Sequence, residues 1–414
     1  MNAPDRTLHA PDADVAAVRD ASELVAWDLI RTLVGFDTTS RDSNLALIHW
    51  VRDYLAGFGI ASTLTFDDEG RKANLFATLP ARDGNATRGG IVLSGHTDVV
   101  PVDGQPWTTP PFAAQQVGDR VVGRGVTDMK SYSATALALV PLFLSRGLER
   151  PLHFALSYDE EVGCIGVRRL IAELPGRGIA PSACIVGEPT GMIPALAHKG
   201  VYRWRCCVRG HAAHSSLTPQ SVNAIEVGAR VVTKLADMAA RWRDEEPRYE
   251  GFDVPYSTGS VGVIEGGIAD NVVPADCRFN YEFRNLPGSD VTAMQGEVRA
   301  YAETLEPAMR AVDADAGIRF ETLCEMPAFL AGADDPAVLL AQRLAATEAT
   351  TLVAFGTEAG LFQRAGTPTV VCGPGHIAQA HQADEYVSLA QLAAGERFLL
   401  ALTTAGIFPV GGRT

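Results

Sequence analysis

Residues Ser94–Pro101 read SGHTDVVP and directly follow the apolar run Ile91–Leu93. A short, continuous apolar run that ends in polar residues is typical of a strand buried in a parallel sheet. His96 and Asp98 are two residues apart, so in an extended chain both side chains point to the same side. An imidazole and a carboxylate that leave the C-terminal end of a strand together suit a divalent metal. Taken alone, the stretch fits an ordinary strand-to-loop turn with a surface histidine equally well.

The composition is that of a globular protein, with 47% hydrophobic and 20% charged residues among 414. This length exceeds one ordinary hydrophobic core and predicts two domains. The formal net charge of −14 repels phosphate backbones and argues against nucleic acid as a partner. Residues 1–24 carry charges throughout, so we expect a frayed tail rather than a secretory signal. No apolar run approaches the roughly 20 residues that cross a bilayer, and the seven scattered cysteines fit reduced thiols in a cytoplasmic protein.

Two more apolar strands, Leu152–Ser157 and Ala183–Val186, end in the polar motifs DEEVG and GEPT. Helical patterns lie between the strands, and this alternation predicts an α/β domain with a mostly parallel sheet. Ligands of such sheets collect at the C-terminal ends of the strands. The expected helices of this part are Ser22–Gly35, Ser43–Phe58, Tyr132–Ser145, Pro336–Thr347 and Leu389–Thr403.

The pattern changes near residue 198. Gly200–Arg209 alternates, with Tyr202, Trp204 and Cys206 on one side, as in a half-buried strand. The elements that follow give the order β-α-β-β-α-β, a ferredoxin-like sheet with helices on one face. We therefore predict an inserted domain at residues 198–327 and a discontinuous first domain made of residues 1–197 and 328–414.

Acidic and histidine side chains recur at the expected strand ends and helix starts. Their number suits two metals that share one carboxylate, although a single loop carboxylate is more often simply solvated. Glu160 and Glu161 are neighbours, so in extended backbone they project in opposite directions, and one could bind metal while the other acts as a general base. A chance surface pair explains them equally well. The clusters are His96 with Asp98, Asp128, Glu160 and Glu161 with Glu188, and His376 with His381.

Taken together, these motifs resemble one known family. SGHTDVVP, GRGVTDMKS, DEEVG, GEPT, RGHAAHSS and GPGHIAQAHQADEY occur in this order between about Arg31 and the end of the chain. They are similar to the motifs of the M20 family of dinuclear zinc amidohydrolases, and the late segment is most similar to its acetylornithine deacetylase branch. This resemblance implies hydrolysis of the N-acetyl amide of N2-acetyl-L-ornithine to L-ornithine and acetate, a step of arginine biosynthesis. The alternative is a succinyl-diaminopimelate desuccinylase or another N-acyl-amino-acid amidohydrolase of the family.

The resemblance also implies roles for individual residues. His96 and Glu188 would bind one metal, Glu161 and His381 the other, and Asp128 would bridge the two. The metals would be Zn²⁺, with Co²⁺ possible because a His and carboxylate set accepts both. His376 has no matching role and is interpreted as a loop residue.

The remaining implied roles concern catalysis and substrate. The family likeness makes Glu160 the general base and Asp98 the acid that orients His96. His214 would reach the active site of the partner subunit in a homodimer formed through the inserted domain, a lid and dimerisation domain, although a histidine before Ser215 also fits a helix cap. The implied substrate contacts are Arg284 to the α-carboxylate, Asn271, and Glu358 to the side-chain ammonium.

Overall fold

The computed structural model describes residues 18–404, and the chain divides into two units, each described separately below. The first comprises the chain up to Leu196, Ala331–Thr351 and the chain from Phe362 onward. The second comprises Ala197–Leu330 and Leu352–Leu361. The expected boundaries differ from this division chiefly at Leu352–Leu361, which we had placed in the first domain. The expectation of a frayed N-terminal tail falls largely on residues 1–17, which lie outside the described residues.

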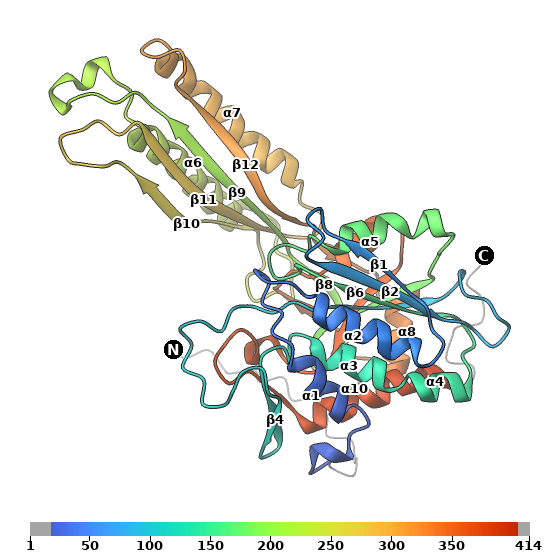
Figure 1. Ribbon diagram of the computed structural model, residues 1–414. Helices are drawn as coiled ribbons and strands as arrows, with labels where there is room; N and C mark the ends of the chain where they lie inside the picture. The colour runs from blue at the N-terminus through green and yellow to red at the C-terminus, as the bar shows by residue number, and fades with distance from the viewer. Residues whose placement is uncertain (1–17, 405–414) are drawn as a thin grey trace, which may run out of the picture. The chain divides into compact units, whose positions relative to one another are not determined.

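Four parallel strands form the centre of the sheet in the first unit (Figure 1). They are adjacent in the order β6 (Leu152–Ser157), β3 (Ile91–His96), β7 (Ala183–Pro189) and β15 (Thr369–Gly373). Every residue of these four strands is buried, which explains why their sequences are apolar almost throughout. The predicted α/β class with a mainly parallel central sheet is confirmed.

Antiparallel strands flank this centre, and their antiparallel pairing was not predicted from the sequence. β1 (Ser62–Phe66) and β2 (Ala73–Leu79) continue the sheet beyond β6, and β8 (Ala195–His198) continues it beyond β15. The short strands β13 (Phe329–Leu330) and β14 (Thr351–Val353) pair with β8. A separate three-stranded sheet contains β4 (Gln115–Val117), β5 (Arg120–Val122) and β16 (Tyr386–Ser388).

Two helix predictions in the first unit need correction. The single helix expected at Tyr132–Ser145 is two helices with a break at Leu139, because Pro141 lacks the N–H that a helix interior needs. The helix expected to extend to Phe58 ends at Ala56, and Phe58 is 38% exposed. The helices of this unit are α1 (Trp27–Val34), α2 (Leu45–Ala56), α3 (Lys130–Ala138), α4 (Val140–Arg146), α5 (Val167–Glu173), α8 (Pro336–Ala345) and α10 (Leu389–Leu400). Helix α9 (Ala359–Arg364) begins in the segment assigned to the second unit and ends in the first.

Helix α3 packs closely on strand β7 at a glycine. A β-carbon on Gly187 would lie 2.1 Å from the Tyr132 ring, far inside any allowed contact. The missing side chain therefore lets the buried Tyr132 ring lie against the strand, one residue before Glu188.

The second unit is a four-stranded antiparallel sheet in the order β10-β11-β9-β12, with two long helices. Tyr202, Trp204 and Cys206 of β9 are buried in the same core as Trp242 of α6 and Val298 of α7, so both helices cover the same face. The predicted alternation along this strand is confirmed. The elements are β9 (Gly200–Arg209), α6 (Ala224–Glu245), β10 (Thr258–Gly266), β11 (Asp276–Asn285), α7 (Val291–Arg310) and β12 (Gly317–Met326).

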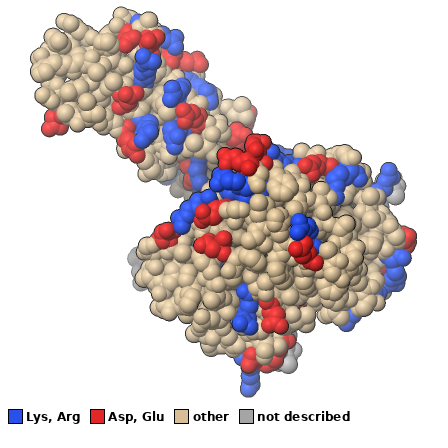
Figure 2. Space-filling model, viewed as in Figure 1, with Lys and Arg blue, Asp and Glu red and all other residues tan. Residues whose placement is uncertain are grey.

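The other face of this small sheet is charged. Arg203 pairs with Glu282 at 2.9 Å across neighbouring strands, and Arg278 pairs with Glu265 at 2.6 Å. Figure 2 shows basic and acidic side chains interspersed on the drawn surface of this unit. Cross-strand pairs of opposite charge stabilise a solvent-facing sheet modestly.

Two further expectations concern the described residues as a whole. Within residues 18–404, no helix combines the length and the apolar character needed to span a membrane. All seven cysteines are free thiols, and each except the half-buried Cys207 is buried.

Candidate metal centre

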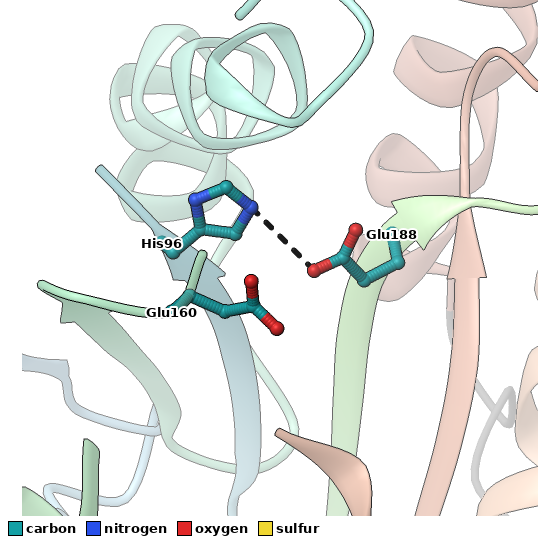
Figure 3. A group of neighbouring side chains, drawn as sticks. All are labelled: His96, Glu160 and Glu188. Atoms are coloured by element: carbon teal, nitrogen blue, oxygen red, sulfur yellow. Dashed lines mark ion pairs between the residues drawn. The ribbon is translucent and has the colours of Figure 1, made fainter. Parts of the chain in front are cut away.

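Three adjacent parallel strands deliver the first side chains of the centre. His96 is the last residue of β3, and the register pairs it with Ser157, the last residue of β6. The chain that leaves β6 therefore carries Glu160 to the neighbourhood of His96. On the other side of β3, Ser94 pairs with Val186, which places Glu188 of β7 level with His96. Figure 3 shows the carboxylates of Glu160 and Glu188 pointing toward the His96 ring.

Asp128 lies between two histidines. Its Oδ1 is 2.9 Å from Nε2 of His96, and its Oδ2 is 3.0 Å from Nε2 of His381. Glu188 Oε1 stands 3.6 Å from the same nitrogen of His96, and Glu161 Oε2 stands 3.1 Å from that of His381. The five side chains for which the family likeness implies metal binding thus come together, and each oxygen of Asp128 faces one His and Glu set.

The side chains form two groups of three potential metal ligands, and within each group the ligand atoms lie within 4.8 Å of one another; both groups contain His96. The first contains Glu160 and Glu188, and the second contains Asp128 and Glu161. Glu160, expected to be a general base, therefore lies close enough to this centre to exchange a proton with a molecule bound there. The assignment of separate ligand and base roles stays a prediction.

The electrostatics of the cluster indicate a shortage of positive charge. Burial and the nearby Asp128 carboxylate raise the pKa of Glu188 well above its usual range, and they raise the pKa of Glu161 as well. The carboxylates of Asp128 and Glu161 raise the pKa of His381 to about 11. Oε1 of Glu161 is buried without a hydrogen-bond partner. Crowded carboxylates with an unsatisfied oxygen fit divalent cations, which supply the missing charge and take oxygen and imidazole ligands.

Asp98 is buried and holds the neighbouring segment in place. Its two carboxylate oxygens accept hydrogen bonds from the backbone N–H groups of Glu160 (3.1 Å) and Glu161 (3.3 Å), and Ser40 Oγ donates at 2.7 Å. The Nδ1 atom of His96 lies 2.9 Å from the backbone oxygen of Asp98 and 3.6 Å from its carboxylate. In this structure the carboxylate is therefore bonded to the DEE segment, and the backbone carbonyl is the closer partner of His96.

Two side chains that support this segment were not predicted from the sequence. Lys72 is nearly buried and forms an ion pair with Asp159, which has left-handed backbone at φ 56°. Cys164 is buried and its thiol lies 3.3 Å from Oε1 of Glu160. Left-handed backbone in non-glycine residues is costly and clusters at functional sites. Asp159 could have been noticed in the sequence as a third acid beside Glu160 and Glu161. Nothing in the sequence around Lys72 indicates its partner.

The other predicted residues lie in the second unit, so their roles stay predictions. His214 is exposed, and its Nδ1 accepts a hydrogen bond from the Ser216 N–H at 3.3 Å, which is the helix cap that we had weighed against catalysis. This bond places the ring proton on Nε2 in the neutral form, the tautomer that can donate to an oxyanion. Asn271 is also exposed, and it lies near His214 because its backbone oxygen accepts a hydrogen bond from the Ser215 N–H at 3.0 Å.

Arg284 and Glu358 differ in their surroundings. The guanidinium of Arg284 is bonded to Glu282 through Nε at 2.8 Å and Nη2 at 3.3 Å, so a substrate carboxylate would have to compete with that partner. Glu358 is buried at the start of α9, with 1% of its surface exposed. In the first unit, the exposed His376 caps the short helix at Ile377–Gln379, in keeping with its interpretation as a loop residue.

Comparison with known proteins identifies the family. The model of peptidase family M20/M25/M40 matches residues 92–405, which include all of the residues of the candidate centre. The chain belongs to the M20 family. The predicted metal-dependent amidohydrolase is therefore confirmed at the level of the family.

Several M20 relatives are similar over most of their length. An acetylornithine deacetylase from Myxococcus xanthus is 36% identical over 378 residues, which cover 89% of this chain and 93% of the relative. An acetylornithine deacetylase from Yersinia pseudotuberculosis is 33% identical over 360 residues, covering 86% and 89%.

Solved structures share the fold at lower sequence identity. An M20 metallo-carboxypeptidase from Sulfolobus solfataricus has a TM-score of 0.71 at 15% identity, covering 92% of this chain and 98% of that one. A dinuclear metal-binding M20 peptidase from Bacillus subtilis has a TM-score of 0.60 at 15% identity, covering 92% and 97%.

Proposed function

We propose that this M20 enzyme hydrolyses N2-acetyl-L-ornithine to L-ornithine and acetate, in the cytoplasm and as a step of arginine biosynthesis. The relatives named acetylornithine deacetylase support the substrate. The observation that carries the chemistry is the Asp128 carboxylate, which directs one oxygen to His96 and the other to His381. His96 with Glu188 and His381 with Glu161 would hold two Zn²⁺ ions, with Asp128 shared between them; Co²⁺ suits the same donors.

The mechanism assigns steps to the chain's own residues. When bound, the metals supply Lewis acidity that lowers the pKa of water and polarises the amide carbonyl. Glu160 accepts a proton from the attacking water as its oxygen adds to the carbonyl carbon. The C–N bond then breaks, and Glu160 returns the proton to the leaving nitrogen of ornithine. Asp98 contributes by holding the backbone of Glu160 and Glu161.

Substrate recognition would use side chains of the second unit. Arg284 suits the α-carboxylate because a guanidinium binds a carboxylate through two parallel hydrogen bonds. Glu358 suits the side-chain ammonium of ornithine by charge, and Asn271 suits a polar group of the substrate. His214 would donate Nε2–H to the oxyanion.

The first experiment compares substrates. Zinc- or cobalt-loaded protein is assayed with N2-acetyl-L-ornithine and with N-succinyl-L,L-diaminopimelate, and Glu160→Gln protein purified in parallel gives the background. We expect kcat/KM for the acetyl substrate to exceed that for the succinyl substrate by roughly 10²-fold or more, because pocket contacts to a different acyl group and chain differ in several polar interactions. The reverse ratio would favour the desuccinylase, and activity on neither would point to another N-acyl amino acid.

We also propose a homodimer formed through the second unit. Strand β10 is at the edge of its sheet, and its Val263 and Ile264 are 51% and 54% exposed. Ile268, which follows the strand, is 88% exposed. An edge strand with exposed apolar side chains is a surface on which a second copy can pair.

Mixing two inactive variants tests whether His214 acts across the dimer. Glu160→Gln and His214→Ala proteins are unfolded together, refolded as a mixture and assayed. If His214 serves the partner, each mixed dimer has one complete site, so activity should return to about a quarter of wild type, since about half of the dimers are mixed. Unmixed samples of each variant are the controls. A mixture as inactive as its parents, with mixed dimers verified by a tag, would show that His214 acts within its own chain.

A further inference from the structure

Glu385 binds the loop that carries Asp128. Its side chain is fully buried, four residues after His381. Its Oε1 accepts three backbone hydrogen bonds, from Gly125 at 3.0 Å, Thr127 at 3.0 Å and Asp128 itself at 3.2 Å. A carboxylate oxygen suits three converging N–H groups, because the charge strengthens each bond. The backbone position of Asp128 therefore depends on one distant oxygen.

The Arg124 guanidinium neutralises the buried charge of Glu385. Oε2 lies 2.6 Å from Nη1 of Arg124, and both side chains are at most 1% exposed. The Arg124 guanidinium also donates to Gln105, whose amide nitrogen donates to the backbone oxygen of His381 at 3.1 Å. Side-chain hydrogen bonds therefore link the loop that carries Asp128 to the loop that carries His381.

The backbone of this loop depends on the arrangement. Gly125 has φ +83°, and a β-carbon there would lie 2.9 Å from Val99 and 3.1 Å from Lys130. The backbone oxygen of Glu385 accepts a further bond from Gly123 at 2.9 Å, and Tyr386 pairs with Val122 in the small sheet. The backbone that leads to Asp128 is therefore bonded along its length to the segment that begins at Glu385.

We propose that Glu385 is a positioning residue that holds the Asp128 carboxylate between the two histidine and glutamate sets. This inference rests on the proposed metal centre and assigns the geometry of its shared ligand to a residue that touches neither metal nor substrate. Loss of the Oε1 acceptor would leave three buried N–H groups without a partner, and the loop would move to satisfy them. The 2.9 and 3.0 Å distances from Asp128 to its two histidines would then no longer be maintained.

The experiment measures metal binding directly. Zinc affinity of Glu385→Gln and Glu385→Leu is measured by calorimetric titration of metal-stripped protein, and metal content by elemental analysis. Gln keeps one oxygen for the three N–H groups but loses the charge, and Leu loses both oxygens. We expect metal affinity to fall about 10- to 100-fold in Glu385→Gln, the usual effect of removing a partner of a ligand, and further in Glu385→Leu. The kcat should fall in parallel while KM stays within about twofold, because the substrate contacts are unchanged.

A destabilised control separates positioning from stability. Leu55→Ala leaves a cavity in the fully buried side of α2, which packs on β1 and β2. Although Leu55→Ala lowers the Tm, as Glu385→Gln is also expected to do, it should bind metal with wild-type affinity. Wild-type affinity and kcat in Glu385→Gln, or equal metal loss in Leu55→Ala, would overturn the inference. Because binding is measured without substrate, a wrong substrate assignment leaves the result intact, whereas a wild-type protein that binds no metal would overturn the centre and this inference together.

Discussion

Glu160→Gln protein should keep its full metal content and lose turnover by roughly 10²- to 10⁴-fold, the usual contribution of a general base. Gln has the shape of Glu, so the packing around this nearly buried side chain, including the Cys164 thiol at 3.3 Å, should persist. What is lost is the ability to accept a proton from water at neutral pH. KM should change little, because the amide adds no charge and removes no substrate contact.

The neighbouring residue gives the matched control. Glu161→Gln makes the same chemical change one position along the chain, but Glu161 faces His381 at 3.1 Å and is expected to be a ligand. It should therefore lose metal as well as activity. Elemental analysis and steady-state kinetics on both variants separate the roles. Near wild-type turnover in Glu160→Gln would remove the base assignment, and metal loss in that variant would make Glu160 a ligand.

His381→Ala should reduce the metal content from two ions per chain to one, and turnover by roughly 10²-fold or more, because one catalytic metal supplies several kcal/mol of transition-state stabilisation. The second set would retain only Glu161 and a share of Asp128, which is too few donors for a tightly bound ion. The first set, built from His96 and Glu188, loses no donor. The measurement is metal content after gel filtration, followed by kcat with added Zn²⁺.

His376→Ala is the matched control for His381→Ala. His376 belongs to the same loop and is exposed, and its ring accepts a hydrogen bond from Ala378 at 3.2 Å. Its removal should cost about 1 kcal/mol of stability as a lost helix cap, with two metals retained. Two ions in His381→Ala would refute its assignment as a ligand, and loss of one in His376→Ala would assign that role to His376 instead.

Several strands were predictable because their burial is reflected in their composition. β6 and β9 begin and end where the apolar run and the alternating run predicted, at Leu152–Ser157 and Gly200–Arg209. The antiparallel pairing of β1, β2 and β8 was not predictable, since the order and direction of strands in a sheet depend on partners distant in sequence. The long helix was wrongly joined across Pro141 because its apolar pattern continues on both sides of the break.

Some residues of the candidate centre were likewise predictable from the sequence and others were not. His96, Asp128, Glu161, Glu188 and His381 were found as donors at strand ends and by family likeness, and the structure brings them together. Glu385 was missed although it stands in the motif that located His381. Its partners are backbone N–H groups up to 260 residues away, and every sequence carries such groups at every position but proline. Lys72 was missed for a similar reason, because a single lysine gives no sign of the acid that it will meet.

The lack of a side chain at Gly187 limits which positions near the centre can be varied in engineering. Tyr132 of α3 packs against β7 at Gly187, Asp128 lies two residues before α3 begins, and Glu188 directly follows Gly187 in β7. Libraries that vary acyl-group preference should leave Gly187 and Tyr132 unrandomised. A methyl group added at Gly187 would push Tyr132 and α3 away from β7. Many variants in such a library would then be inactive because their metal ligands are too far apart, and this would obscure selection for a new substrate.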